Sequence, residues 1–258
     1  MHVQPLTKAI GAEISGVDLR DVDDEAVAAI RAAWLEHSVV FFRDQTLTPK
    51  EQVALAERFG EVVPPPVDSG VAQPEPGVLV LDQISPVGVG TDRWHADSTF
   101  LPDPPMGAIL HAVELPSVGG DTLFAGMHAA YESLSEPLRQ MLDGLTAVHS
   151  SRPVDEIMGV ERVAQWTVHP VVRVHPETGR KTLFVNGNWT TRICELSLDE
   201  SDHILGLLFD HVKSPMNQCR FRWTEGAVAF WDNRAVQHFA SPDYDERRLM
   251  HRVLLAGR

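Results

Sequence analysis

The chain has 258 residues, 43% of them apolar and 22% charged, which is enough for one globular domain with a sizeable core. Its 36 acidic and 22 basic residues give a formal charge of −14, which excludes the basic surface that nucleic acids or anionic membranes require. No apolar run reaches the roughly 18 to 20 residues that span a bilayer, and the first residues lack the layout of a signal peptide, so we expect a soluble cytoplasmic protein.

The cysteine content limits the redox and metal chemistry of the chain. Its two cysteines, Cys194 and Cys219, are too few and too isolated for a disulfide framework or a cysteine-based zinc site. Histidine is the abundant ligand type, with twelve residues.

Capping residues and apolar periodicity predict helices at four places. Residues 23–37 carry apolar side chains at helical spacing on one face. Residues 48–51 form a capping box with proline at the first helical position, and residues 197–200 repeat the box before another apolar-periodic run. A weaker helical pattern covers residues 128–142.

Short segments rich in Val, Phe and Leu and bounded by Gly or Pro are predicted as strands. They are residues 39–43, 78–82, 108–115, 122–125, 171–175, 183–186, 220–223, 227–231 and 249–256. The helices are too irregularly interleaved for a parallel α/β sheet, so we predict a mainly β fold, an antiparallel barrel-like sandwich with helices outside. Residues 62–77 and 84–93 are predicted loops, and long loops beside a rigid barrel often carry functional sites.

His95 and Asp97 form the first candidate metal site. In an extended chain both side chains project from the same face, so they could bind one ion. A His-x-Asp spacing also arises by chance in a chain with twelve histidines, so alone it carries little weight. A competing pattern, His175 with Glu177, surrounds a proline and precedes a Thr-Gly pair, and we predict a plain hairpin turn there.

His238 supplies a third potential ligand. It follows a predicted buried strand, residues 227–231, and a polar turn. Two histidines and one carboxylate on one face of an octahedron leave three positions for a chelating cosubstrate and dioxygen, an arrangement typical of non-haem Fe(II) oxygenases. Zinc hydrolases more often use three histidines or a helical His-Glu-x-x-His motif, which this sequence lacks.

The last predicted strand carries two arginines on one face. Alternation places Arg248 and Arg252 on the same side as Met250 and Leu254. If this face points into a barrel, both guanidinium groups require anions, because burying an unpaired charge costs several kcal/mol per ion. Bound carboxylates or sulfonates would meet that need through bidentate contacts. The alternative is an edge strand that holds both arginines in water.

The order and spacing of these segments resemble the Fe(II)/2-oxoglutarate-dependent dioxygenases of the taurine dioxygenase (TauD/TfdA) family, which also holds alkylsulfatases and 2,4-D dioxygenases. The matching segments are residues 10–18, 39–45, 58–61, 94–100, 115–123, 169–176, 184–186, 231–234, 237–238 and 248–252. Each segment is a weak signal, and their combination is specific. The resemblance implies one domain over residues 1–258 with a double-stranded β-helix (jelly-roll, cupin-like) core.

The resemblance also implies roles for the candidate residues. His95, Asp97 and His238 would ligate Fe(II). Thr122 and Arg248 would bind the distal carboxylate of 2-oxoglutarate. The implied reaction uses dioxygen, converts 2-oxoglutarate to succinate and CO2, and hydroxylates a substrate carbon through an Fe(IV)-oxo species, while the protein supplies ligand geometry, orientation and exclusion of water.

The predicted substrate-binding residues depart from those of taurine dioxygenase itself. Arg252 matches the position that holds the anionic group of the substrate. Pro65 replaces a histidine that contacts the sulfonate, and proline cannot donate a hydrogen bond. Thr91 replaces a substrate-contacting asparagine, and Trp189 replaces a pocket phenylalanine. We therefore expect a small or medium anionic substrate other than taurine, such as another sulfonate, an alkyl sulfate or a carboxylate.

Two functions from other classes remain open. One is a catalytically silent small-molecule-binding protein with a jelly-roll fold, although the candidate ligands are intact. The other is a metal-dependent hydrolase on a cupin-like barrel, which activity without dioxygen and 2-oxoglutarate would favour. The habit of the family also favours a homo-oligomer.

Overall fold

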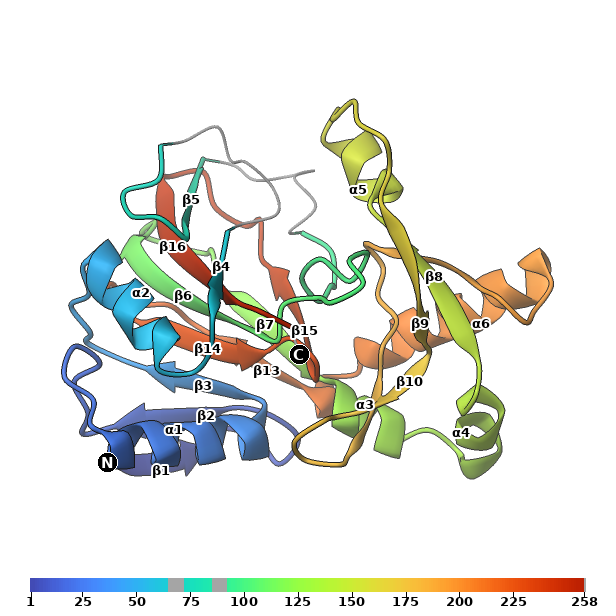
Figure 1. The fold of residues 1–258 in the computed structure, drawn as a ribbon, viewed down its shortest axis with the longest axis horizontal. Helices are drawn as coiled ribbons and strands as arrows, with labels where there is room; N and C mark the ends of the chain where they lie inside the picture. The colour runs from blue at the N-terminus through green and yellow to red at the C-terminus, as the bar shows by residue number, and fades with distance from the viewer. Residues whose placement is uncertain (65–71, 85–91, 258) are drawn as a thin grey trace.

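A computed structural model describes residues 1–64, 72–84 and 92–257 (Figure 1). Its helices are α1 (Asp24–His37), α2 (Pro49–Glu57), α3 (Met127–Glu132), α4 (Glu136–Leu142), α5 (Arg152–Ile157), α6 (Leu198–Val212) and a 3₁₀ helix (Pro215–Asn217). Among the residues in these ranges, no helix has the length and apolar character needed to cross a membrane.

The strands of the described residues form four sheets. The largest contains, in spatial order, β1 (His2–Pro5), β2 (Ala12–Ser15), β3 (Val39–Phe42), β14 (Val228–Asp232), β6 (Gly107–Glu114), β16 (Arg248–Leu255) and β4 (Val62–Val63), with β5 (Val78–Gln83) also paired to β16. A second sheet has the order β13 (Gln218–Phe221), β7 (Thr122–Gly126), β15 (Val236–Ala240). The other two sheets are β12 (Thr190–Ile193), β8 (Thr146–Ser150), β9 (Trp166–Pro170), and the pair β10 (Val172–Val174), β11 (Lys181–Leu183).

The main core lies between the largest sheet and the β13–β7–β15 sheet. Phe124 of β7, Trp231 of β14, and Met250 and Leu254 of β16 are buried in this layer. The strands around it pair antiparallel: β14 with β3 and β6, β16 with β5 and β6, and β7 with β13 and β15. In the largest sheet β2 and β3 pair parallel. Two sheets packed face to face, built mostly from antiparallel strands far apart in sequence, confirm the predicted jelly-roll core.

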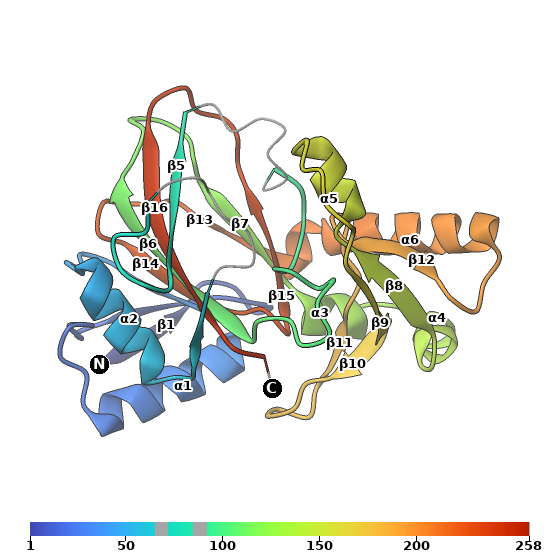
Figure 2. The same ribbon diagram turned by 45° about the horizontal axis from the view of Figure 1, so that its top comes forward.

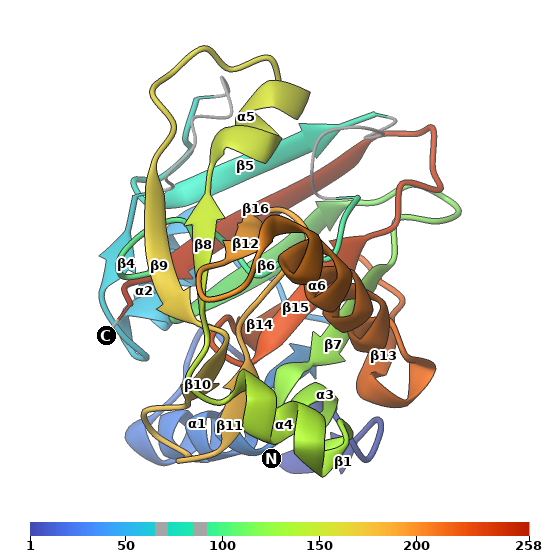
Figure 3. The ribbon, with the colours of Figure 1, turned by 90° about the vertical axis from the view of Figure 1, so that its right-hand side faces the viewer.

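Helices cover the core from outside. Figure 2 shows α1 and α2 along one side of the largest sheet, where Trp34 and Leu55 pack with Ile109, Phe230 and Val253. Figure 3 shows α6 beside the β12–β8–β9 sheet, and their apolar side chains form a separate cluster with α3. The helices cover the outer faces of the sheets and leave the strand ends of the core uncovered, where a functional site can lie.

Capping chemistry explains where the helices begin. The carboxylate of Asp23 accepts a hydrogen bond from the N–H of Ala26 at the start of α1, and both predicted capping boxes are complete, at α2 and α6. The prediction of one helix over residues 128–142 is wrong, because the chain forms α3 and α4 there. Ser135 between them is extended, and Pro137 has no N–H with which to continue a helix.

The predicted strands are present with shifts of up to two residues at their ends. The exception is the strand predicted at residues 183–186, since β11 ends at Leu183 after pairing with β10. That pairing confirms the hairpin turn at His175. The sequence missed β1, β2, β4, β8, β9, β12 and β15. These strands are short, and all of them except the two-residue β4 contain proline, charged or polar residues. Their pairing with other strands overrides the weak local preference.

Candidate metal and cosubstrate site

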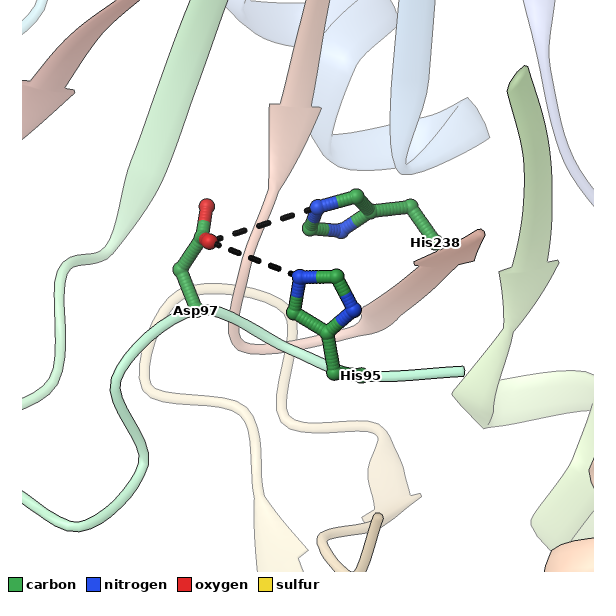
Figure 4. Close-up of side chains that lie close together, drawn as sticks. All are labelled: His95, Asp97 and His238. Atoms are coloured by element: carbon green, nitrogen blue, oxygen red, sulfur yellow. Dashed lines mark ion pairs between the residues drawn. The ribbon is translucent and has the colours of Figure 1, made fainter. Parts of the chain in front are cut away.

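His95 and Asp97, two positions apart in the chain, meet the distant His238 at the edge of the core (Figure 4). Nε2 of His95 and Nε2 of His238 lie 3.9 and 4.0 Å from Oδ1 of Asp97, and the three ligand atoms all lie within 4.8 Å of one another. These separations are too long for hydrogen bonds, but they suit atoms that share one ion with bonds of about 2.1 Å. All three residues are buried, and Oδ2 of Asp97 has no hydrogen-bond partner among the described residues. The donor set therefore fits a divalent metal.

Backbone pairing sets the spacing of the two histidines. The N–H of His95 donates to the carbonyl of His238 at 3.1 Å, and the N–H of His238 donates back at 2.8 Å. This bridge attaches the segment of His95 and Asp97 to strand β15, and it brings the imidazole centroids to 4.2 Å. The two candidate histidine ligands are thus held by main-chain contacts.

Electrostatics keep the histidines neutral and the aspartate charged. Burial lowers the pKa of His95, and it lowers the pKa of His238 to about 3. Burial acts to raise the pKa of Asp97, but the positive charge of Arg252 is the largest opposing influence, and this pKa lies below its ordinary value. The Nδ1–H of His95 donates to the carbonyl of Arg93 at 2.7 Å, which leaves Nε2 with the lone pair that a metal needs.

Strand β16 directs both arginines inward. Nη1 of Arg252 lies 3.0 Å from Oδ1 of Asp97, and Arg248 is 3% exposed. Met250 and Leu254, on the same face, pack between the two core sheets. The predicted alternation is confirmed, and the alternative of an edge strand with both arginines in water is wrong, because β16 pairs with β6 on one side and with β5 and β4 on the other.

Arg248 and Thr122 meet around one indole ring. The guanidinium carbon of Arg248 lies 5.9 Å from the ring centroid of Trp223, and the indole Nε1–H of Trp223 donates to Oγ1 of Thr122 at 2.9 Å. Nε of Arg248 donates to the carbonyl of Gly120 at 3.1 Å. Gly120 has φ +72°, and a Cβ there would lie 3.1 Å from Cδ of Arg248. Sequence reasoning missed Trp223, because a tryptophan at a strand end carries no distinguishing signal.

The buried guanidinium of Arg248 lacks a carboxylate partner among the described residues. Its Nη2 forms no hydrogen bond there, and burial lowers the pKa of Arg248. A buried cation in this state is stabilised by an anion that accepts two parallel hydrogen bonds. The geometry therefore suits a carboxylate bound between Arg248 and Thr122.

Trp189 supports the segment that carries two of the candidate ligands. Its indole Nε1–H donates to the carbonyl of Ala96 at 2.8 Å, and its ring packs edge-on against Phe100 with centroids 4.9 Å apart. Thr91 and Pro65, which the sequence also predicts to affect substrate choice, both lie outside the described residues.

A layer of buried polar side chains lies behind the metal-ligand segment. The hydroxyl of Thr99 donates to Nδ1 of His149 at 2.8 Å and accepts from Nδ2 of Asn186 at 3.0 Å. Nε2–H of His169 donates to the carbonyls of Thr99 and Leu101 at 3.0 and 3.1 Å. Strands β8 and β9, which the sequence missed, thus hold the backbone just beyond Asp97.

We expect the stability of the protein to fall as the pH is lowered from 7 to 5. Burial, reinforced by His169 and Arg173, lowers the pKa of His149 to about 3, whereas an unfolded histidine titrates near about 6.5. Between these two pKa values the unfolded chain binds more protons than the folded chain, so the free energy of unfolding decreases as the pH is lowered. His149 contributes about 2 kcal/mol of this decrease at pH 5. Urea unfolding at the two pH values measures the change.

Two histidine variants test the source of this pH dependence. His149→Gln should reduce the difference between pH 7 and pH 5, whereas His203→Gln should leave it unchanged, because His203 is exposed on α6. An equal pH dependence in the wild type and His149→Gln would show that other groups cause the effect.

A jelly-roll core with a buried His-Asp-His group defines the class of non-haem metal oxygenases. The chain belongs to the family described as taurine catabolism dioxygenase TauD, TfdA family, whose model matches residues 2–254. It is a 2-oxoglutarate-dependent non-haem iron dioxygenase that uses Fe(II), 2-oxoglutarate and dioxygen. The family resemblance seen in the sequence is confirmed.

Characterised relatives are similar over the whole chain. An alpha-ketoglutarate-dependent sulfate ester dioxygenase of Pseudomonas putida is 41% identical, with 100% of this chain and 90% of the relative covered. An alkylsulfatase of Acinetobacter baylyi is 38% identical, with 100% of this chain and 85% of the relative covered. The crystal structure of a taurine dioxygenase from Burkholderia xenovorans has a TM-score of 0.88 and 39% identity, covering 100% of this chain and 91% of that one.

Proposed function

We propose that the enzyme oxidises alkyl sulfates. In this proposal His95, Asp97 and His238 hold Fe(II), while Arg248 and Thr122 bind the distal carboxylate of 2-oxoglutarate. The observation that carries it is the buried group of three ligand atoms within 4.8 Å of one another. The buried guanidinium of Arg248 has no carboxylate partner among the described residues, and its Nη2 forms no hydrogen bond there, which supports the cosubstrate assignment because a dicarboxylate supplies an anion.

Arg252 is the proposed anchor for the anionic group of the substrate. Its guanidinium lies 3.0 Å from Oδ1 of Asp97, so an anion held by it lies beside the metal ligands. Nε of Arg252 is buried without a hydrogen-bond partner among the described residues, and it can donate to a sulfate oxygen. Trp189 and Thr91 are proposed to line the pocket around the rest of the substrate.

The chemistry of a sulfate ester fits this arrangement. Fe(II), 2-oxoglutarate and dioxygen together supply an oxidant that hydroxylates a C–H bond and yields succinate and CO2. When the hydroxylated carbon carries the sulfate ester, its C–O bond breaks, sulfate leaves, the hydroxyl proton passes to water, and an aldehyde remains. The protein residues hold the ligands, orient the two acids and exclude water.

Two curated relatives support an alkyl sulfate, whereas a solved structure at 39% identity is named a taurine dioxygenase. Two proteins that are 41% and 38% identical to this chain are a sulfate ester dioxygenase and an alkylsulfatase. The replacement of the sulfonate-contacting histidine by Pro65 in this sequence agrees with this choice.

Succinate release across a panel of acids tests the proposed substrate. The panel contains a linear alkyl sulfate, taurine, a phenoxyalkanoate and the neutral alcohol with the same chain length as the sulfate. We expect the alkyl sulfate to give the highest rate, with aldehyde and inorganic sulfate in equal amounts. A higher rate with taurine or with the phenoxyalkanoate would overturn the substrate assignment. Cleavage of the alkyl sulfate without dioxygen or 2-oxoglutarate would identify a metal-dependent hydrolase.

Arg252→Ala is expected to raise the KM for the anionic substrate roughly 10- to 100-fold, because a hydrogen bond between charged groups contributes about 1.5–3 kcal/mol. The affinity for 2-oxoglutarate should change much less. Arg247→Ala is the matched control, since Arg247 lies on the opposite face of the chain and pairs with exposed Asp82 and Glu114. Unchanged KM in Arg252→Ala would refute the anchor role.

A further inference from the structure

Asn233 lies in the turn between β14 and β15, and its side chain forms hydrogen bonds with both peptide groups of Asp97. Its Oδ1 accepts a hydrogen bond from the N–H of Asp97 at 2.7 Å, and its Nδ2 donates to the carbonyl of Asp97 at 2.9 Å. The same Nδ2 donates to the carbonyl of Pro105 at 2.9 Å. Asn233 is 2% exposed, so these contacts form out of competition with water. The side chain of Asn233 thus connects Asp97 and Pro105 to the turn between β14 and β15.

The backbone conformation next to Asp97 is unfavourable and needs hydrogen bonds from outside the segment to maintain it. Ser98, the next residue, has φ +51°, a left-handed conformation that is unfavourable for a residue with a Cβ and persists only when its surroundings impose it. The carboxylate of Asp97 contacts Arg252 but has no hydrogen bond to Oδ2 among the described residues. The direction of that carboxylate therefore depends mainly on the position of its own main chain, which Asn233 holds.

The turn that carries Asn233 is itself rigid. Asp232 accepts hydrogen bonds from Nε2 of His175 at 2.9 Å and from Nη2 of Arg234 at 2.7 Å, and Arg234 pairs with Glu177 at 2.8 Å. The side chains of His175 and Asp232 are buried and that of Arg234 is mostly buried, with exposed fractions of 1–10%. Buried, fully paired groups of this kind resist movement. Asn233 is therefore presented from a fixed base.

The same turn leads directly into β15, the strand of His238. His238 is paired by backbone hydrogen bonds to His95, and Asn233 is paired to Asp97. One short stretch of chain thus sets the position of the other two candidate ligands. A change in Asn233 should move Asp97 relative to both histidines while leaving the histidine bridge in place.

We propose that Asn233 is a positioning residue that fixes Asp97 relative to His95 and His238 and thereby sets the affinity of the site for a divalent metal. The inference rests on the proposed metal role of Asp97. Asn233 does not belong to the group of candidate metal ligands among the described residues. It acts on the site through its two hydrogen bonds to the main chain of Asp97. Partners that orient a metal ligand change metal affinity about 10- to 100-fold when they are removed.

Metal binding by the intact chain tests this role without any measurement of turnover. Calorimetric titration with Mn(II) or Co(II) gives the dissociation constant, and the absorption bands of bound Co(II) report ligand geometry. Asn233→Ala should raise the dissociation constant at least about 10-fold and alter the Co(II) bands. Asn233→Ser, which is too short to reach both peptide groups, should show the same change and serves if the alanine variant does not fold.

Asn217→Ala is the matched control. Asn217 is also a buried asparagine, 3% exposed, and its Nδ2 donates to the carbonyl of His211, away from the metal ligands. Its replacement should lower stability but leave the Mn(II) and Co(II) dissociation constants unchanged. If Asn233→Ala and Asn217→Ala have the same small effect on metal affinity, the positioning role is refuted.

A double variant separates the positioning role from the ligand role. In an Asp97→Ala background, Asn233→Ala should cause no further loss of metal affinity, because Asn233 acts through Asp97. Additive losses would show that Asn233 acts by another route and would overturn the proposal. If Asp97→Ala itself leaves metal affinity unchanged, the assignment of the metal ligands fails instead.

Discussion

Asp97→Ala should lower the rate of succinate release at least about a thousandfold and should weaken Fe(II) binding. Asp97 supplies the one carboxylate in the His-Asp-His group of the described residues, and Oδ1 lies near Nε2 of both histidines. Its loss removes a ligand and a compensating negative charge from a buried divalent ion, which neutral histidines cannot replace. Initial rates at saturating Fe(II) and 2-oxoglutarate, together with a metal titration, measure both effects.

Asp210→Ala provides the comparison for this variant. Asp210 is an exposed carboxylate on α6 that pairs with Lys213, so its removal takes away the same charge far from the site. It should retain the wild-type rate and metal affinity. Wild-type turnover in Asp97→Ala would disprove the metal assignment and with it the proposed catalytic centre.

Arg248→Ala should raise the dissociation constant of 2-oxoglutarate about 100-fold, since a charge-assisted contact in a buried site is worth up to about 3 kcal/mol. At saturating 2-oxoglutarate much of the wild-type rate should return, because Arg248 does not belong to the metal-ligand group. Anaerobic addition of Fe(II) and 2-oxoglutarate should produce the visible charge-transfer band of the chelate. Titration of that band measures the affinity directly.

Arg248→Lys refines this test. Lysine keeps the positive charge but cannot form the paired contacts of a guanidinium, so we expect an affinity between those of the wild type and Arg248→Ala. The metal affinity of both variants should stay at the wild-type level. A charge-transfer band with unchanged affinity in Arg248→Ala would place the 2-oxoglutarate carboxylate elsewhere.

Local signals were sufficient for much of the fold. The capping residues of α1, α2 and α6 lie beside the positions they cap, and the alternation of β16 lies within eight residues, so both could be predicted. The break between α3 and α4 was missed because helical periodicity outweighed one proline in the pattern. The short strands β8, β9 and β12 carry mixed polar residues, and they exist because they pair with one another.

Local sequence signals also predicted only some residues of the candidate site. His95 and Asp97 could be paired from their spacing, and Arg248 and Arg252 could be placed on one face from strand alternation. His238 entered as a candidate only because it follows a buried strand and a turn. Asn233 lies in the family-like segment 231–234, but the sequence assigned no role to it or to Trp223, since the importance of both comes from what they contact.

The sequence was sufficient for the starts of α1, α2 and α6, for the inward face of β16 and for the residue types available to bind a metal, because these depend on neighbours within a few positions. Tertiary structure alone decided that His238 bridges His95, that Arg252 meets Asp97 and that Asn233 holds the Asp97 backbone. Each of these contacts joins residues more than a hundred positions apart. Periodicity states which way a side chain points, but only the packed sheets determine what lies opposite it.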